Sequence, residues 1–569
     1  MKKLILLVLA LGLAVLSGAG CAENGKHDLT SASFPLYYET FETGTDMRLY
    51  FVDGVKDLPY IEAEDMLAML EEFYDAPAVG IDIHFTLEKN GSVLTYRRLD
   101  DQYHLLMTLD FERDTIDFVD YNMFCQRGDA STIMDSVVLN VFNSKGEPTV
   151  FQKVDKGSYT RFGDPLTFYL EQYGIDLIAQ DGLYLIPLQT MSDIIMSPSN
   201  KGNFFFNGKN LILSSDLKSC AQVYYDVPTG KRSQELADFG YGELCMLLDY
   251  FYGLRDTHKI DSFTRLFHNV GFDVILKDPD AEQADLALYR TIVDFLDDNH
   301  TSWNAFSYLS GPVDYKASGA ARTHIFDHLE RQEQARAKAY PQGIPGYEEV
   351  GNTAYITFDH FDWMVSDAEE YYSVEDPRVF PDEDTIGLIM KAHAMITREN
   401  SPVENVVLDL SANLGGADDA AIFAMAWFLG EASISVTDNM TGAMCTTVYR
   451  ADVNRDRKFD EQDTVSDKHL FCLISPVSFS CGNLVPCIFK ESGKVTLLGR
   501  TSGGGSCAVM NTSTAWGTAF QISSNQRMSF LKNGSFYDID RGADPDFVLA
   551  SPERYYDRAA LTEYLNSIR

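Results

Sequence analysis

The pattern of apolar and polar positions changes twice along the 569-residue chain. From about residue 30 to 220, short segments alternate apolar with polar residues and are separated by Gly, Asp and Asn, which is typical of β-strands. Residues 236–310 carry apolar residues at helical spacing instead. From about residue 350 onward, strand-like apolar runs alternate with helix-like segments, which predicts a mainly parallel α/β core.

Two polar stretches set the predicted domain boundaries. Residues 226–235 are typical of a linker, and residues 341–352 of a hinge. We therefore expect an N-terminal α+β module over 23–225, a helical subdomain over 236–340 and the α/β core over 346–569. Within the module, residues 59–74 and 185–195 resemble each other, since each places a strand and a Pro beside an amphipathic helix. No catalytic constellation is evident in the module, which favours a binding or spacing role.

The first 22 residues predict an export signal, with two lysines, an apolar run and a patch of small residues. Cys21 at the end of this segment indicates a lipoprotein cleavage site with lipid on the Cys. Gly18 stands where a Leu is usual, so secretion after cleavage near Ala22 is the alternative. The expected location is outside the cell, either anchored to the membrane surface through Cys21 or secreted.

The composition limits the partners of the protein. The net charge is −38, from 46 basic and 84 acidic residues. Nucleic-acid binding requires basic patches, so no nucleic acid is expected as a partner. None of the nine cysteines has the C-x-x-C spacing of a zinc site. Most are flanked by apolar residues, which favours buried thiols over disulfides.

The strongest chemical signal is Ser480, in HLFCLISPVSFSCGNLVPCIF (469–489). An apolar strand, a turn containing Pro and a helix-periodic segment follow one another here, so Ser480 falls where a strand passes into a helix. A hydroxyl at this point lies beside free backbone N–H groups, as an acyl-transfer nucleophile requires. The alternative is a serine that only caps the helix.

Four ordered blocks resemble the tail-specific, or C-terminal processing, serine peptidase family. They are DLSANLGG within 404–429, the Ser480 turn, GRTSGGGS (499–506) and GADPD (542–546). The resemblance covers about residues 350–550 and implies a crotonase-like α/β core with Ser480 as nucleophile. Gly505 stands where the bacterial processing proteases place their catalytic Lys, and Asn483 stands where the family usually has Glu.

The same resemblance implies the partners of Ser480. His300, in Asp297-Asp298-Asn299-His300-Thr301, matches the general base of the tricorn-like branch of the family. The chemistry of imidazole suits that role, and the alternative is a His favoured by the dipole at the end of a helix. Asp544 matches the acidic residue that orients the base.

The resemblance also implies an oxyanion hole. It would be formed by the N–H of Gly415 or Gly416 together with the N–H of Cys481. The alternative is that these glycines only form a turn between a strand and a helix. Such a turn has the same backbone as an oxyanion hole, so the two interpretations do not exclude each other.

Residues 451–463, ADVNRDRKFDEQD, have the spacing of a calcium loop. Oxygen ligands at positions 1, 3, 5, 7, 9 and 12 would come from Asp452, Asn454, Asp456, the carbonyl of Lys458, Asp460 and Asp463. Arg457 replaces the usual Gly at position 6, and position 12 is Asp instead of Glu. The alternative is an acidic hairpin tip. If calcium binds, it is expected to be structural, because no cofactor is expected for catalysis.

The sequence thus predicts an exported serine endopeptidase that hydrolyses peptide bonds in a peptide or protein substrate. A non-catalytic peptide- or ligand-binding protein on the same fold is the alternative, because the family Lys is missing and Asn483 replaces Glu.

Overall fold

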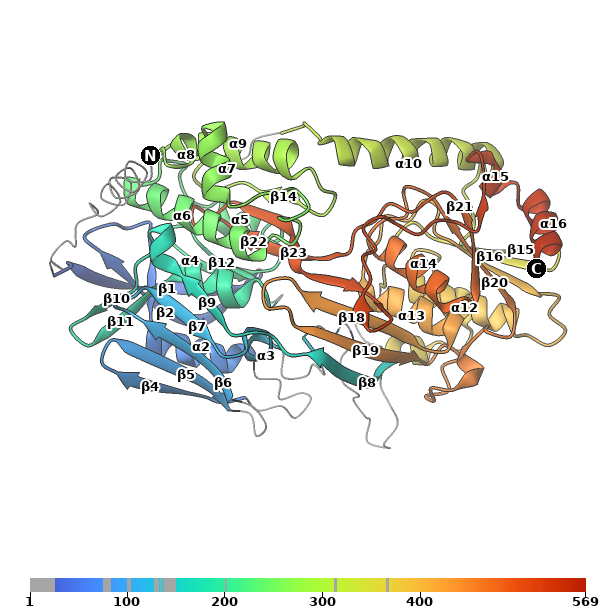
Figure 1. Cartoon of the computed structure of the whole chain (residues 1–569), viewed down its shortest axis with the longest axis horizontal. Helices are drawn as coiled ribbons and strands as arrows, with labels where there is room; N and C mark the ends of the chain where they lie inside the picture. Colours follow the sequence, from blue (N-terminus) through green and yellow to red (C-terminus); the bar gives the residue numbers. More distant parts are fainter. Residues whose placement is uncertain are drawn as a thin grey trace, which may run out of the picture.

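The computed structural model describes residues 26–74, 83–99, 104–126, 132–133, 135, 137, 150–199, 202–311, 315–364 and 368–569. The predicted signal segment 1–22, with Cys21, lies outside these residues. Figure 1 shows two lobes that are joined by long strands and spanned by one long helix. Within the described residues, no helix is long and apolar enough to cross a membrane.

The N-terminal lobe contains two antiparallel-rich sheets. The seven-stranded sheet has the order β10 (Ile178–Gln180), β11 (Leu183–Pro187), β3 (Tyr60–Glu62), β2 (Phe41–Val52), β1 (Leu29–Tyr38), β13 (Leu211–Ser214) and β12 (Asn203–Phe206). The five-stranded sheet has the order β4 (Phe85–Asn90), β5 (Val93–Leu99), β6 (His104–Asp110), β7 (Thr115–Phe118) and β9 (Leu166–Tyr169). The helices of this part are α2 (Ala63–Tyr74), α3 (Tyr121–Cys125), α4 (Leu188–Met191) and α5 (Ala221–Tyr224). The two similar stretches form the units β3–α2 and β11–α4, and their strands pair with Ile186 opposite Ile61.

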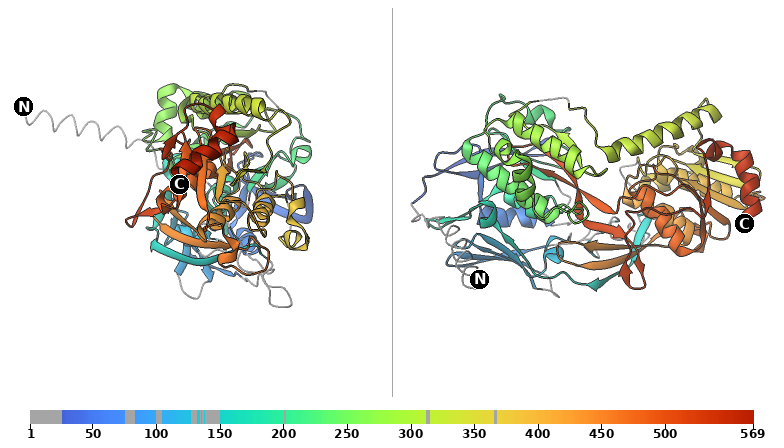
Figure 2. Two further views of the ribbon diagram at one scale, coloured as in Figure 1. Left: turned by 90° about the vertical axis from the view of Figure 1, so that its right-hand side faces the viewer. Right: turned by 45° about the horizontal axis from the view of Figure 1, so that its top comes forward.

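A group of helices completes the N-terminal lobe. They are α6 (Gln234–Phe251), α7 (Phe263–Val270), α8 (Phe272–Leu276) and α9 (Ala281–Arg290). A π-helical turn at Thr291–Leu296 follows α9 and leads into the segment that carries His300. The next helix, α10 (Ala320–Ala339), leaves the N-terminal lobe and reaches the far end of the molecule, where it packs against α15 (Glu553–Tyr556) (Figures 1 and 2).

The core lobe is built on a six-stranded sheet. Its order is β15 (Tyr347–Val350), β16 (Thr353–Thr357), β17 (Asn405–Asp409), β20 (His469–Ile474), β21 (Val495–Gly499) and β26 (Phe547–Val548), and all neighbours except β15 and β16 are parallel. Its helices are α11 (Glu369–Ser373), α12 (Thr385–Ile396), α13 (Asp418–Leu429), α14 (Cys481–Ser492), α15 and α16 (Arg558–Ile568). Apolar runs such as NVVLD form these strands because a parallel sheet is buried on both faces.

A fourth sheet connects the two lobes and crosses the predicted domain boundaries. Its path is β14 (Ser302–Ala305), β23 (Ala519–Ser529), β18 (Ala432–Asp438), β19 (Met444–Ala451) and β8 (Gln152–Arg161), with β22 (Cys507–Ser513) on β23. β8 belongs by sequence to the module predicted over 23–225, yet it pairs with β19. The β22–β23 hairpin comes from the core, yet its tip residue Trp516 is fully buried in the N-terminal lobe. Local patterns predict strands but not their distant partners.

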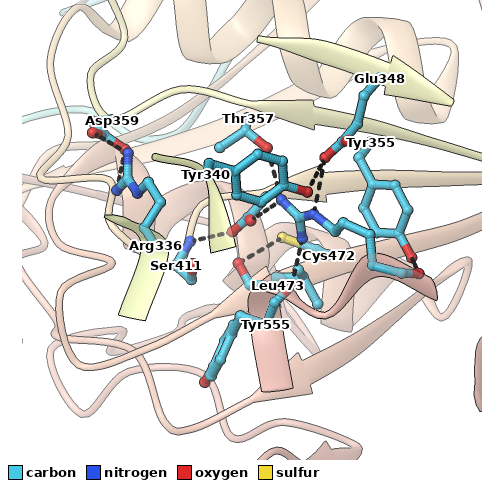
Figure 3. A network of polar contacts seen from close by, with 12 residues as sticks. Arg336, Tyr340, Glu348, Tyr355, Thr357, Asp359, Ser411, Cys472, Leu473 and Tyr555 are labelled. Atoms are coloured by element: carbon cyan, nitrogen blue, oxygen red, sulfur yellow. Dashed lines mark hydrogen bonds and ion pairs between the residues drawn. The ribbon is translucent and has the colours of Figure 1, made fainter. Parts of the chain in front are cut away.

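Two ion pairs fix the C-terminal helix and α10 to the core sheet. Arg558 of α16 donates to Asp409 at the end of β17 at 2.7 Å, and both side chains are buried. Arg336 of α10 donates both terminal nitrogens to Asp359, and Figure 3 shows this pair beside the partly buried network around Tyr340 and Glu348. The charges of Arg558 and Asp409 are tolerated in the interior because they are paired and hydrogen-bonded.

Candidate active site

Ser480 occupies the turn between β20 and α14 with a backbone that serine rarely adopts. Its φ is 57° and its ψ is −124°. This region costs a non-glycine residue about 1–3 kcal/mol, and such residues cluster at functional sites. Ser480 is the N-cap residue of α14, but its side chain makes no capping hydrogen bond. The hydroxyl therefore does not perform the capping role that was the alternative.

Hydrogen bonds on both sides of the turn hold Ser480 in this conformation. The N–H of Phe479 donates to the carbonyl of Asn413, and the N–H of Ser480 donates to the carbonyl of Gly504. Within the turn, Ser478 donates its hydroxyl to the carbonyl of Leu410. The turn is thus fixed between the end of β17 and the segment after β21, and these contacts offset the backbone strain.

Three glycines surround the turn because no side chain fits there. A Cβ on Gly415 would lie 2.6 Å from the Cβ of Ser480, and one on Gly482 would lie 2.6 Å from the carbonyl oxygen of Asn413. A Cβ on Gly505 would lie 2.6 Å from the ring of Phe479. Contacts this short essentially never occur for a real Cβ, so the sequence keeps glycine where the backbone approaches Ser480.

Ser480 and His300 line the same cavity, of about 420 Å³, which we call the catalytic cavity. His300 is buried, and its ring packs on Phe479 with the ring centroids 4.6 Å apart. Its Nε2 atom is buried without a hydrogen-bond partner. No hydrogen bond links Ser480 and His300 within the described residues. The other residues that line the cavity are Asn299, Arg322, Ile325, Phe326, Leu414, Gly416, Phe479 and Val509.

The turn that carries His300 is held by Asp298 and by β23 of the β22–β23 hairpin. Asp298 Oδ1 accepts the N–H of His300 at 3.0 Å and the N–H of Thr301 at 2.8 Å. Gln521 of β23 donates its side-chain amide to the carbonyl of His300 at 2.7 Å. Burial lowers the pKa of His300, and the charges of Asp298 and Asp540 oppose that change. The imidazole is therefore neutral near pH 7, as a general base must be.

The geometry does not support Asp544 as the residue that orients His300. Asp544 is exposed, and its Oδ1 accepts the hydroxyl of Thr501 at 2.8 Å. The carboxylates that act on His300 are those of Asp298 and Asp540. Asp540 lies four positions earlier in the same acidic run, and the sequence reasoning missed it because a loop has no periodicity that shows which carboxylate faces the site.

The predicted oxyanion-hole residues lie on both sides of Ser480, but they are not equivalent. The N–H of Gly415 donates to Asn413 Oδ1 at 2.9 Å, so it is already used. Gly416 lines the catalytic cavity, and its bridge to Phe361 uses the N–H of Phe361 and of Ala417 but not its own. Cys481 is the first residue of α14, where an N–H has no acceptor within the helix. The N–H groups of Gly416 and Cys481 are therefore the better candidates for the two donors of an oxyanion hole.

Two departures from the family pattern have a structural explanation. Gly505 has a φ of 93° and contacts Phe479, so a Lys at this position would require the aromatic ring to move. Asn483 is fully buried; it donates to the carbonyl of Ile539 at 3.0 Å and accepts the hydroxyl of Ser502 at 2.7 Å. A carboxylate at position 483 would face that carbonyl oxygen, whereas the amide bonds both groups.

The predicted calcium loop is closed by hydrogen bonds from its own backbone. Asp452 accepts the N–H groups of Asp456 and Arg457, and Asp463 accepts the N–H groups of Val453 and Asn454. The N–H of Lys458 donates to Asp456, and the N–H of Gln462 donates to Asp460. In the part of the chain that the structure describes, no three His, Cys, Asp or Glu residues come together as a metal site. Calcium binding by this loop therefore stays a prediction.

The buried cysteines hold free thiols rather than disulfides. This holds for Cys220, Cys245, Cys445, Cys472, Cys481, Cys487 and Cys507. Burial raises the pKa of the Cys481 thiol far above its usual range, so its side chain is not a competing nucleophile beside Ser480.

A serine on a strained turn between a strand and a helix is also found where serine hydrolases carry their nucleophile. Residues 377–549, which make up most of the core lobe, match peptidase family S41. The resemblance to the tail-specific peptidases is thereby confirmed for the core.

Other comparisons reach parts of the chain. A Chlamydia pneumoniae protein, CPj1016/CpB1054, is 30% identical over 103 residues, which is 18% of this chain and only 16% of that protein. Among solved structures, a Streptococcus agalactiae lipoprotein is 13% identical with a TM-score of 0.37, covering 60% of this chain and 99% of its own. The photosystem II D1 C-terminal processing protease is 15% identical with a TM-score of 0.28, covering 38% and 47%.

Proposed function

We propose that the protein is an exported serine endopeptidase in which Ser480 is the nucleophile and His300 the general base. The observation that carries this proposal is the strained backbone of Ser480 in a cavity that also holds a buried His with an unpartnered Nε2. Two side chains from distant parts of the chain line this cavity, and within the described residues no hydrogen bond occupies the Ser480 hydroxyl or His300 Nε2. The crotonase-like type of core is part of the same proposal.

The proposed reaction uses only groups of this chain. Ser480 Oγ attacks the peptide carbonyl carbon while its proton passes to His300 Nε2. The N–H groups of Gly416 and Cys481 donate hydrogen bonds to the carbonyl oxygen, on which the negative charge develops. His300 then returns the proton to the leaving amine, and water hydrolyses the acyl-enzyme by the reverse steps. Peptides or proteins are the substrates, and no cofactor takes part.

A fluorophosphonate probe tests the nucleophile directly. We expect the probe to form one covalent adduct on Ser480, located by peptide mass spectrometry, and Ser480→Ala to abolish it. Ser535→Ala, which removes an exposed hydroxyl from a short hairpin, is the matched control and should leave labelling unchanged. A folded, unlabelled wild-type protein would contradict the proposal.

The absence of a hydrogen bond between Ser480 and His300 within the described residues favours a second candidate. It is a non-catalytic peptide-binding protein on the same fold. In that case Ser480→Ala leaves peptide affinity intact and the wild type cleaves no peptide in a library. Catalytic hydrogen bonds often tighten only when substrate binds, so the enzyme stays the first candidate.

We also propose that the protein is exported and anchored to the membrane at the cell surface through a lipid on Cys21, with secretion as the alternative. Expression of Cys21→Ser followed by fractionation tests this. The variant should move from the membrane fraction to the soluble fraction, and an unchanged distribution contradicts lipid attachment.

A further inference from the structure

The main chain of His300 is fixed on both sides of the residue. Its N–H donates to Asp298 Oδ1 at 3.0 Å, and its carbonyl accepts the side-chain amide of Gln521 at 2.7 Å. The imidazole ring has no such anchor, because no residue within the described ranges forms a hydrogen bond with either ring nitrogen. The position of the ring therefore depends on the turn that carries it and on the ring of Phe479 beside it.

Asp298 is the centre of that turn. Its Oδ1 accepts the N–H groups of His300 and Thr301 and also the hydroxyl of Ser523. Its Oδ2 accepts the hydroxyl of Tyr252 at 2.8 Å. The two side-chain donors are almost completely buried. A carboxylate with four donors has a fixed orientation, so Asp298 keeps one position beside His300.

The two side-chain donors come from different parts of the fold. Tyr252 follows α6 in the N-terminal lobe, whereas Ser523 lies on β23, which starts in the core. The N–H of Gly253 donates to the carbonyl of Ser523 at 2.8 Å. A Cβ on Gly253 would lie 1.9 Å from the carbonyl oxygen of Ser524, so glycine allows this close approach. Both donors therefore reach Asp298 because the end of α6 lies directly against β23.

We propose that Asp298 is the positioning residue of His300, and that Tyr252 and Ser523 hold its carboxylate in place for this role. The inference rests on the proposed peptidase function. Asp298 does not line the catalytic cavity, so it acts through His300 and not on the substrate. It acts in two ways, through the backbone of the turn and through its negative charge.

The charge of Asp298 matters when His300 takes the proton of Ser480. That proton moves from Ser480 Oγ to His300 Nε2 and later to the leaving amine, while Asp298 neither gains nor loses one. In between, the imidazolium is a cation in a buried site, which burial disfavours and a nearby carboxylate favours. The charged groups that other elements bring near the ring are Asp540, its ion-pair partner Arg527, and Arg322, which lines the same cavity.

Asp298→Asn removes the charge and preserves the turn. The amide oxygen still accepts the backbone N–H groups and the Ser523 hydroxyl, and the amide nitrogen donates to the Tyr252 oxygen. Without the carboxylate the pKa of His300 falls further, so the acid limb of the fluorophosphonate labelling rate should move down by about one pH unit. Above that limb the rate should fall about tenfold, because the imidazolium is less stabilised.

NMR titration of protein with ring-¹³C-labelled histidine measures the same change without the probe. His300→Gln identifies the signal of His300 by its loss. The midpoint of that signal should move to lower pH in Asp298→Asn, in step with the labelling rate.

Tyr252→Phe should change the pH dependence in the opposite direction. It keeps the ring but removes a donor that offsets the charge of Asp298, so the carboxylate acts more strongly on His300 and the acid limb moves to higher pH. Tyr250→Phe, on the same helix, removes a hydroxyl that donates to the carbonyl of Thr167. It is the matched control and should leave both the limb and the rate unchanged. Thermal melting establishes that each variant is folded.

A folded Asp298→Asn variant whose acid limb stays at the wild-type pH would overturn the inference, however slowly it is labelled, because a merely structural residue does not change the pKa of the base. A Tyr252→Phe variant whose limb stays in place or moves downward would overturn it as well, and this variant decides where Asp298→Asn does not fold. A folded wild-type protein that is not labelled overturns the proposed function instead. The NMR titration then still measures whether Asp298 acts on His300.

Discussion

At the scale of single residues, the site depends on which carboxylate acts on His300. Burial lowers the pKa of His300, and the charge of Asp540 opposes this. The base works in its neutral form, so a lowered pKa means that activity persists below the pH of about 6.5 at which an ordinary His becomes protonated. The acid limb of the pH profile should therefore lie below pH 6.5.

Asp540→Asn should move that limb to still lower pH. The substitution removes a negative charge that stabilises the imidazolium, so the pKa of His300 falls further. It also removes one of the two carboxylates that pair with Arg527, which lie at 2.6 Å (Asp540) and 2.7 Å (Asp538), so less of the arginine charge is balanced, and this acts in the same direction. The measurement is the pH dependence of the fluorophosphonate labelling rate. Asp544→Asn is the control and should leave the profile in place; the opposite result would restore Asp544 as the orienting residue.

A second prediction at the scale of residues concerns Gly415. Its φ is +99°, and a Cβ there would lie 2.6 Å from the Cβ of Ser480. Gly415→Ala should reduce labelling of Ser480 at least tenfold and lower the melting temperature, because Ser480 must move or the backbone must change conformation. Gly534→Ala is a matched control, with a φ of +79° and nothing within 4 Å of its Cβ. It should carry only the conformational cost of about 1 kcal/mol. Equal effects of the two substitutions would show that crowding at Ser480 is unimportant.

How far the sequence predicts these residues depends on the kind of signal each one has. Ser480 follows an apolar strand and precedes a helix-periodic segment, and this local pattern together with the flanking family blocks selects it as the candidate nucleophile. The strain at Ser480 and the unused Nε2 of His300 arise from contacts between segments far apart in the chain, which no local pattern contains. Asp540 and Asp544 lie in one loop, where only the folded backbone decides which carboxylate faces His300.

At the scale of elements, the sequence predicts where the strands and helices of the core lie better than it predicts which strands pair with each other. NVVLD, HLFCLI and VTLLG form neighbouring parallel strands, as continuous apolar runs indicate. The sequence does not predict that β8 and the β22–β23 hairpin belong to the sheet that connects the lobes. The alternating pattern of a strand indicates which face is buried but not which distant strand pairs with it. His300 reaches the site because β14, just after it, pairs with β23.

Calcium binding by the 452–463 loop stays a prediction at this scale. The loop already has the left-handed backbone that a calcium loop needs at position 6, where Arg457 has a φ of 63° and pairs with Glu369. A bound ion would neutralise neighbouring carboxylates and bind the folded state alone, so millimolar Ca²⁺ should raise the melting temperature by a few degrees. Asp456→Ala should remove the rise. Identical melting curves with calcium and with a chelator would reduce the loop to an acidic hairpin tip.

At the scale of the whole molecule, the hairpin β22–β23 holds the two halves of the site together. It begins three residues after Gly504, whose carbonyl accepts the N–H of Ser480. From there it runs into the N-terminal lobe, as Figure 1 shows. Trp516 at its tip donates to Asp285 at 2.8 Å, and Gln189 of α4 donates to Ser513. Since His300 belongs to the N-terminal lobe and Ser480 to the core, the docking of this hairpin determines whether the two can meet.

A buried pair of acids lies at this docking surface. Asp193 follows α4, Glu243 lies on α6, and both are almost fully buried. Asp193 accepts the amide of Gln189 and the hydroxyl of Thr512 on β22, and Glu243 accepts the hydroxyl of Thr190. Burial and the neighbouring Glu243 raise the pKa of Asp193 well above its usual range, and burial raises the pKa of Glu243 to about 7.

The pair makes the stability of the molecule depend on pH around neutrality. In the unfolded chain Glu243 titrates near its ordinary value of about 4.3, so between that pH and 7 the folded state binds more protons. This contribution to stability is complete below the unfolded pKa and is lost as the pH rises through 7. For one proton, the free energy of unfolding falls by roughly 1 kcal/mol between pH 6 and pH 8. The melting temperature should therefore be lower at pH 8 than at pH 6, by a few degrees.

Glu243→Gln isolates the effect, because the amide stays neutral at both pH values and still accepts the hydroxyl of Thr190. The fall in melting temperature between pH 6 and pH 8 should shrink in this variant. Glu282→Gln, on the exposed face of α9, is the control and should keep the wild-type fall. Calorimetric melting in buffers of small ionisation enthalpy measures all three proteins. If Glu243→Gln and the wild type lose the same number of degrees, the buried acids do not titrate in this range and the docking of the hairpin is independent of pH.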